Sequence, residues 1–504
     1  MTSPRDPMLF EMAWAADPPL LVNPELGVSK LTSRTAARSF HSDVTLLDST
    51  DHRLQRSGVV LAHRVVDSLG EWYMDAPAWR PWLPVDCSVA LDGAGELPLD
   101  FSCLTKPFLR GAPLSPSAAL RCESDEVSLL GPGGEPLADV VDARIKVTRS
   151  GVTISRAREI TLTPRTDLSQ RLRDWVAIRM IALGATQVDA FPTAQERLGP
   201  PAGALPDFPR PGHLNPGATL EGFVTNRLAG SLRQVIEADL AARSMGMHLH
   251  SGTAEHLLAH FGEPEAILES RRPEDLSDLG TDPVVHSSMG IHDERHGRID
   301  ALRTALGDLA IVVDGLAELL EPRWVRELTV LLDQVLELDP ARITIHRMPE
   351  GYYRLLDMLV VAVRAPKLVR DGAVPARPVL VSMVRGAVSQ VLRLCDKLDV
   401  GTDHGWARAR RQAEAAAALA ATLRVDKRAG KVARRLEKVA TMLADTGSVH
   451  EGPMPEEIAQ LTPAAAFAAG RRLERRLAGI AIARDTFVEK WPDQRAKLLK
   501  AVTP

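Results

Sequence analysis

The chain has 504 residues, of which 45% are hydrophobic and 25% charged, and its formal net charge is −4. Its length predicts two or three domains, and its composition is typical of a soluble globular protein. Near its start no basic segment precedes an apolar one, and no run of about 18 apolar residues occurs, so neither secretion nor a membrane span is indicated. The four cysteines form no CxxC pair, which favours reduced thiols in a cytoplasmic protein.

Residues 8–165 have the pattern of short strands. Apolar runs at residues 58–61, 127–130 and 160–162 are separated by Gly, Pro and Asp, which are turn formers. Residues 130–135 read Leu-Gly-Pro-Gly-Gly-Glu and separate two runs as the turn of a hairpin does. Residues 167–183 then have helical spacing, so we expect an antiparallel β domain that is followed by a helix.

A stretch rich in proline and glycine, residues 199–217, is the best candidate for a domain boundary. After it, apolar residues recur three and four positions apart, which predicts helices that pack as antiparallel bundles. The predicted helices are 302–320, 325–338, 352–363, 379–398, 406–423, 431–443 and 464–487. The sequence therefore predicts a two-domain α+β protein, with a β domain at 8–198, a linker at 199–217 and an all-α domain at 218–500.

Charge is unevenly distributed along the helical part. Residues 221–360 hold 13 Lys and Arg against 24 Asp and Glu, a balance of −11, whereas residues 361–504 hold 26 against 15, a balance of +11. This asymmetry indicates an anionic partner for the last segment. The alternative is that the acidic and basic halves face each other.

The segment 46–64 resembles the signature of the triphosphate tunnel (CYTH) family. The matching positions are Asp48, Asp51, Arg53, Leu54, Gly58, Leu61 and Arg64. Segments 70–77, 118–123 and 158–162 resemble later motifs of that family in the same order, so the resemblance covers most of residues 8–198. It implies an antiparallel β tunnel or barrel that holds a triphosphate between basic side chains and a magnesium or manganese ion.

Several family positions have changed in this chain. The carboxylates left for a metal are Glu11 and Glu159, and Thr161 stands where the closing pair has its second glutamate. The family's tunnel lysine corresponds to Asp75, whereas Arg64 and Arg121 remain. We therefore expect poor triphosphate binding and an inactive domain, because each charge-assisted contact contributes roughly 1.5–3 kcal/mol.

The helical part resembles the conserved-histidine α-helical (CHAD) family at residues 351–357, 404–414, 429–438 and 466–472. His404, Arg408 and Arg411 stand on that family's cationic positions, and His286 lies in a weaker match to its first signature helix. The resemblance implies two helical bundles that enclose a basic channel for inorganic polyphosphate.

The residues support an anion site without the resemblance. Residues at i, i+3 and i+4 share a helical face, so His404, Arg408 and Arg411 form one stripe with no acid between them. Basic residues from 424 to 438 form a second face, and Arg471, Arg472, Arg475 and Arg476 add a third patch. The competing interpretation is a solvated surface that Glu437 and Glu474 balance.

The predicted function is binding of inorganic polyphosphate, free or in granules, or of a similar polyanion. The predicted binding residues are His286, His404, Arg408, Arg411, Lys431, Arg434, Arg435, Lys438, Arg471, Arg472 and Arg475. Binding would require no cofactor. One alternative is a triphosphatase that uses Mg²⁺ or Mn²⁺ at Glu11 and Glu159, and another is a scaffold that binds neither ligand. Nucleic acid is disfavoured because aromatic residues for base stacking are lacking around the basic faces, apart from Trp406.

Overall fold

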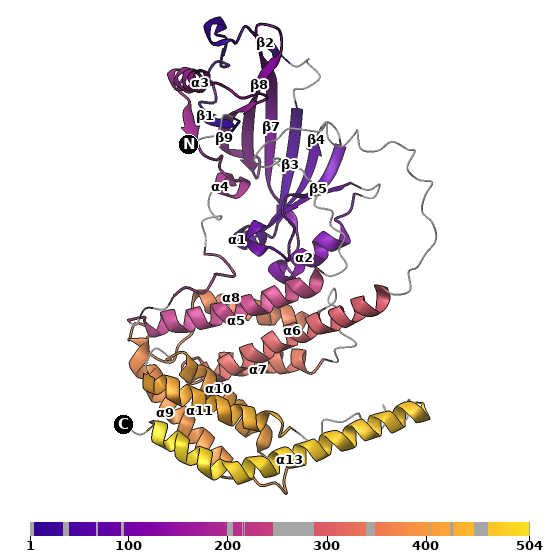
Figure 1. The fold of residues 1–504 in the computed structure, drawn as a ribbon, viewed down its shortest axis with the longest axis vertical. Coiled ribbons are helices and arrows are strands. Elements are labelled where there is room, and N and C mark those ends of the chain that lie inside the picture. Colours follow the sequence, from indigo (N-terminus) through magenta and orange to yellow (C-terminus); the bar gives the residue numbers. More distant parts are fainter. Residues whose placement is uncertain are drawn as a thin grey trace. The chain divides into compact units, whose positions relative to one another are not determined.

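The computed structural model describes residues 5–33, 40–66, 69–91, 95–198, 205–213, 215, 217–244, 287–338, 348–403, 405–423, 427–447 and 462–502. The chain divides into two compact units. The first comprises Met1–Asp207 with Asp239–Arg298, and the second comprises Phe208–Ala238 with Ile299–Pro504. The described strands all belong to the first unit and most of the helical residues to the second, as expected for an α+β protein (Figure 1).

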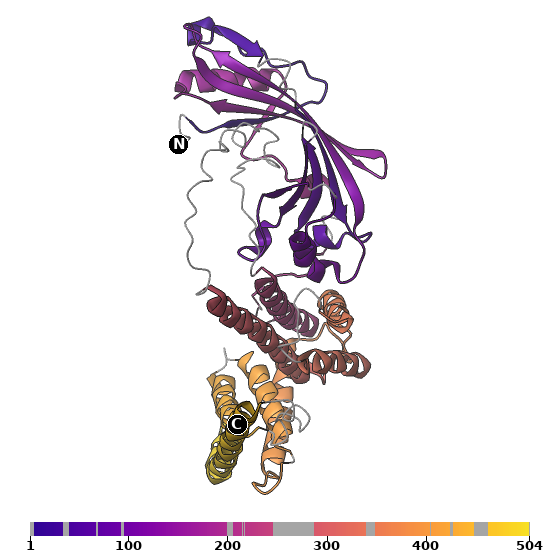
Figure 2. The same ribbon diagram turned by 90° about the vertical axis from the view of Figure 1, so that its right-hand side faces the viewer.

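The first unit is built on one antiparallel sheet. Its strands are β1 (Met8–Met12), β2 (Lys30–Ser33), β3 (Phe40–Asp48), β4 (Val60–Val66), β5 (Leu69–Asp75), β6 (Cys87–Ala90), β7 (Ser115–Leu130), β8 (Pro136–Arg149), β9 (Val152–Pro164) and β10 (Thr186–Val188). They are ordered β10-β1-β9-β8-β7-β3-β4-β5-β6, and β2 pairs with β7. The hairpin predicted at residues 130–135 joins β7 to β8. Figure 2 shows the strong twist of this sheet.

The predicted tunnel would require the two ends of the strand order to meet. In the part of the chain that the structure describes, β10 and β6 are the two ends, and no pairing joins them. The sheet is therefore open. The coarser prediction, an antiparallel β domain, is confirmed, and closure into a barrel is not observed.

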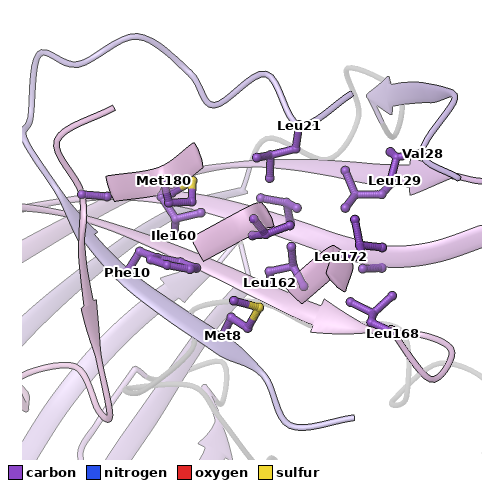
Figure 3. Close-up of a cluster of buried hydrophobic side chains, with 14 of the residues drawn as sticks. Met8, Phe10, Leu21, Val28, Leu129, Ile160, Leu162, Leu168, Leu172 and Met180 are labelled. Atoms are coloured by element: carbon purple, nitrogen blue, oxygen red, sulfur yellow. The ribbon is translucent and has the colours of Figure 1, made fainter. Parts of the chain in front are cut away.

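Helix α3 (Gln170–Ala182) covers one face of the sheet, which we call the first face. The Ser169 side chain accepts a hydrogen bond from the backbone N–H of Leu172 and so caps this helix. Figure 3 shows the resulting core of buried apolar side chains. It joins Met8 and Phe10 of β1 and Ile160 of β9 to Leu172 and Met180.

The opposite face, which we call the second face, carries a separate apolar cluster. Successive strand residues point to opposite faces, and Ala143, Ile145 and Val147 of β8 have the other parity from Val140, which belongs to the first core. The strand register aligns them with Leu120 and Cys122 of β7. The short helix α4 (Ala194–Leu198) contributes Leu198 to this cluster, so a chain segment lies against the second face as well.

The helices of the remaining chain agree with the periodicity of the sequence. They are α5 (Leu220–Arg243), α6 (Ser287–Leu316), α7 (Pro322–Leu336), α8 (Glu350–Arg364), α9 (Ala376–Cys395), α10 (Trp406–Ala421), α11 (Lys427–Ala444) and α13 (Pro463–Val502). Helix α5 has no counterpart among the individually predicted helices, although it lies in the part predicted to be helical. Helix α6 begins fifteen residues before the predicted 302, and α13 ends fifteen after the predicted 487. Among the described residues, α9 alone is long and apolar enough to cross a membrane, and it packs against α10 and α13.

Small residues let α10 approach its neighbours closely. Six of its eight buried residues are alanines, and they face α11 and the other helices of the bundle. A Cβ added at Gly315 of α6 would lie 3.4 Å from the carbonyl oxygen of Ala415. An added Cβ would therefore be in van der Waals contact with the backbone of α10, so α6 and α10 pack closely here.

Arg484 of α13 joins the ends of several helices. Its side chain is 4% exposed and forms an ion pair with Asp403. It also donates to the backbone oxygens of Thr446 at 3.1 Å, Gly447 at 2.6 Å and Thr402 at 3.4 Å. Its guanidinium lies 5.1 Å from the centre of the Trp406 ring. One buried cation thus connects the start of α10, the end of α11 and the middle of α13.

Candidate functional site

The best-formed cationic surface is on α11. Lys431, Arg434 and Lys438 are exposed and Arg435 is half-buried, whereas the opposite side of the helix is buried, notably at Leu436. Seven residues separate Lys431 from Lys438, a distance of about 10 Å along the helix axis. Within the described residues, none of the four cations has an ion-pair partner. We call these four residues the α11 face.

The stripe on α10 is less bare than its sequence suggests. Arg408 and Arg411 are both exposed, but Arg411 faces Asp314 of α6. Desolvation raises the pKa of the Asp314 carboxyl, and the charge of Arg411 opposes that rise. No acid lies between the three residues in the sequence, but a carboxylate of another helix interacts with the stripe. His404 and His286 lie outside the described residues.

The α10 stripe and the α11 face belong to one helical hairpin. Arg410 donates to the backbone oxygen of Ala444 at 3.4 Å, so the start of α10 lies beside the end of α11. Lys438 is six residues before Ala444 and Lys431 is thirteen, which is about 9 Å and about 20 Å along the axis. The α11 face therefore runs away from the start of α10, and Lys431 is its most distant member.

The third predicted group is on the N-terminal half of α13. Arg471, Arg472 and Arg475 are exposed, and burial on α13 begins only at Ile480, whose side chain lies near Gly447. Figure 1 shows this half of α13 extending past α9, α10 and α11. The predicted residues with described side chains therefore form three separate patches.

A groove between α10, α11 and α13 was not predicted. Its volume is about 730 Å³, and its basic lining residues are Arg410, Arg476 and Lys490, with Asp445 as an acid. These residues come from three helices, so only the tertiary structure brings them together, although the sequence places Arg476 in the third patch. An ion pair of 2.9 Å between Arg410 and Glu414 marks one side of the groove.

A second groove, of about 630 Å³, adjoins the first and shares Thr441 with it. Its lining includes the acids Asp308, Glu414 and Glu437, together with Arg227. Desolvation lowers the pKa of Arg227. A polyanion that follows the basic groove therefore meets an acidic wall beyond Thr441.

The remaining tunnel arginines of the first unit are engaged within the domain. Arg64 is buried on the second face, where it forms an ion pair with Glu71 and donates to the Ser88 hydroxyl at 3.1 Å. Its guanidinium lies 5.1 Å from the centre of the Tyr73 ring. These contacts leave one terminal nitrogen, Nη1, without a partner in the described structure.

Arg121 does not share a surface with Arg64. Its strand neighbours Leu120 and Cys122 belong to the cluster on the second face, so Arg121 points to the first face. There it is exposed and pairs with Asp43 at 2.8 Å. The predicted tunnel role of Arg121 is therefore corrected by the period of the strand.

The predicted metal ligands, Glu11 and Glu159, lie directly opposite each other on β1 and β9. The cation at this pair is Arg197 of α4, which forms an ion pair with Glu159. Among the described residues, no group of three or more His, Cys, Asp or Glu side chains could hold a metal. A magnesium or manganese ion prefers several oxygen ligands, so these residues do not fit one while Arg197 is in place.

The matches at Asp48, Leu54 and Gly58 have structural roles. Asp48 is buried and accepts hydrogen bonds from the backbone N–H groups of Ser49, Leu54 and Gln55, which fixes the short helix α1 (Arg53–Arg56). Leu54 is fully buried, and Gly58 has a φ of 73°, a value that favours glycine. This segment therefore builds a turn at the end of β3.

Asp51, in the same turn, should make stability depend on pH. Partial burial raises its pKa, but hydrogen bonds from Ser49 and Arg53 outweigh that effect and lower the pKa to about 2. In the unfolded chain the pKa of an aspartate is about 3.9. The stability that the ionised Asp51 contributes is therefore fully present above that pH and is lost as the pH falls towards 2. We expect Asp51→Asn to destabilise the protein at pH 6 but not near pH 2, as measured by urea denaturation. Equal destabilisation at both values would contradict this.

Comparison with known proteins gives no family for this chain. No model of a protein family matches it, and no curated protein matches it. A candidate adenylate cyclase from Bacillus halodurans is similar to 34% of this chain over 96% of its own, with 10% identity and a TM-score of 0.21. A candidate adenylyl cyclase from Hippeastrum, described as having a dominant triphosphatase activity, is similar to 37% of this chain over 91% of its own, with 8% identity and a TM-score of 0.19. Similarity at this level indicates no function for this chain.

Proposed function

We propose that the helical unit binds inorganic polyphosphate, or a linear polyanion of similar charge, and that the α11 face is its main contact. The observation that carries this proposal is a set of four cations on one regular helix that have no ion-pair partner among the residues that the structure describes. Like charges three and four residues apart destabilise a helix by a few tenths of a kcal/mol per pair. An anion bound along the face removes this repulsion.

The other patches extend the proposal to long ligands. The exposed half of α13 and the groove lined by Arg410, Arg476 and Lys490 supply further cations, and the α11 face lies between about 9 Å and about 20 Å along the helix from the start of α10. A long chain can contact several patches at once, whereas a short one can contact only one. We therefore expect affinity to rise steeply with chain length. The resemblance to the conserved-histidine family supports the same ligand class. His286 enters only through that resemblance, whereas His404 enters also through its spacing from Arg408 and Arg411.

The test is a fluorescence titration with long-chain polyphosphate at two salt concentrations. Arg434→Glu combined with Lys438→Glu should weaken binding at least about tenfold and make its salt dependence shallower, because two phosphate contacts are lost. The matched control is Arg323→Glu with Arg326→Glu on α7, two exposed arginines that change the net charge equally. We expect the control to change affinity less than about twofold.

Two outcomes would count against the proposal. Equal weakening by both variant pairs would mean that the ligand senses only net charge, and absence of saturable binding would favour the scaffold. Tripolyphosphate hydrolysis that needs Mg²⁺ or Mn²⁺ and disappears in Glu159→Ala would instead establish the triphosphatase alternative. The ion pair between Arg197 and Glu159 argues against that outcome.

A further inference from the structure

The segment that holds α4 is anchored to the second face of the sheet by side chains. Arg197 is 8% exposed and its partner Glu159 is 7% exposed, so their ion pair is shielded from water. Leu198 is buried in the apolar cluster, and its backbone oxygen accepts a hydrogen bond from Arg149 at 3.3 Å. Two side chains and one backbone contact therefore fix the end of this short helix.

Helix α4 could not persist without such anchors. It has five residues, and a helix of that length is unstable in isolation because nucleation is unfavourable. Thr193 and Glu196 exchange hydrogen bonds at its start, as in a capping box. This local arrangement supports one turn, and the contacts of Arg197 and Leu198 determine where that turn lies.

The carboxylates opposite α4 need a cation. Glu11 and Glu159 are direct cross-strand partners, and like charges in that position destabilise a sheet. Glu159 is buried, so the repulsion is poorly screened. Arg197, 38 residues later in the chain than Glu159, brings the neutralising charge.

We infer that α4 is a built-in closure of the second face, in which Arg197 is the counter-ion of Glu11 and Glu159 and Leu198 fills the adjoining apolar cluster. The buried carboxylate that a metal ion would need there is thereby paired within the chain itself. While α4 is in place, Glu159 and the adjoining apolar cluster are buried, whereas Glu11 is exposed. Release of α4 would expose Glu159 and the apolar surface beside it.

Cys122 provides a direct readout of this closure in the full-length protein. It is buried in the same cluster as Leu198, and Cys103 and Cys395 are buried elsewhere. We expect Arg197→Met to raise the rate at which a thiol reagent modifies Cys122 at least about tenfold, because the unpaired Glu159 favours opening of α4. Peptide mass spectrometry would measure each cysteine separately, and Cys103 and Cys395 should keep their wild-type rates.

A second variant separates release of α4 from general unfolding. In Arg197→Met with Glu159→Gln no buried carboxylate is left unpaired at position 159, so protection of Cys122 should return towards the wild-type level. Arg121→Met, which removes an exposed arginine from the first face, should change nothing. Unchanged labelling of Cys122 in Arg197→Met would overturn the inference, as would a rise at all four cysteines that Glu159→Gln does not reverse. Saturable Mn²⁺ binding to the wild-type protein that Glu159→Gln abolishes would also overturn it.

Discussion

Replacing Arg484 by methionine should lower the free energy of unfolding of the helical unit by about 3–5 kcal/mol. The substitution keeps most of the apolar stem but removes the charge from Asp403 and the donors from three backbone oxygens. A buried acceptor that loses its donor destabilises the folded state, because water no longer solvates it. The favourable contact between the guanidinium and the Trp406 ring is lost as well. Urea denaturation followed by circular dichroism at 222 nm would measure the change.

The matched control for Arg484 is Arg410→Met. Arg410 also pairs with an acid, Glu414, but its side chain is substantially exposed. Its loss should change the free energy of unfolding by less than about 0.5 kcal/mol, because exposed pairs within a helix contribute little. If both variants lost the same stability, Arg484 would not have the central structural role that its contacts indicate.

Replacing Asp207 by asparagine should destabilise the first unit by about 3–5 kcal/mol. Asp207 is fully buried and accepts hydrogen bonds from Arg56 at 2.8 Å and from Arg110 at 2.6 Å. The side chain of Arg110 is 2% exposed, so its charge would remain in the interior without a carboxylate. These contacts hold residue 207 against α1 and the end of helix α2 (Leu99–Leu109).

Asp167→Asn is the corresponding control, because Asp167 pairs with Arg5 at 2.6 Å on the surface, with side chains 66% and 71% exposed. We expect a change of less than about 0.5 kcal/mol from this variant. Thermal unfolding monitored by tryptophan fluorescence would compare the two, since Trp79 is buried and donates to the backbone oxygen of Ser57 beside α1. A stable Asp207→Asn variant would show that the buried arginines find other acceptors.

Periodicity was sufficient to predict most of the architecture. Helices α7 to α11 were expected within a few residues, because each has one apolar side, and the turn between β7 and β8 was expected from its glycines and proline. Helix α2 was not predicted. Seven of its eleven residues are buried, so the sequence lacks the alternation of apolar and polar sides that identifies a surface helix. It also contains Pro107, a residue that usually ends a helix.

The candidate site was predictable only where its pattern is local. The four cations of the α11 face are three and four residues apart on one helix, and this spacing can be read from the sequence. Pairings such as Arg411 with Asp314 and Arg197 with Glu159 join residues far apart in sequence, and no spacing rule connects them. At Arg121 the alternation with Leu120 and Cys122 was visible, but the sequence does not say which face of the sheet lies towards α4.

The small residues of α10 constrain how this protein can change during evolution. The buried alanines of α10 lie in the helical core, where a larger side chain would be destabilising, whereas an exposed residue of α11 such as Arg434 can be exchanged with little effect on packing. During evolution, the charges on the surface of α11 should therefore change faster than the side-chain volumes at the buried positions of α10. Distant relatives would then be recognised by the spacing of their alanines, and their ligands could differ even where their backbones superimpose.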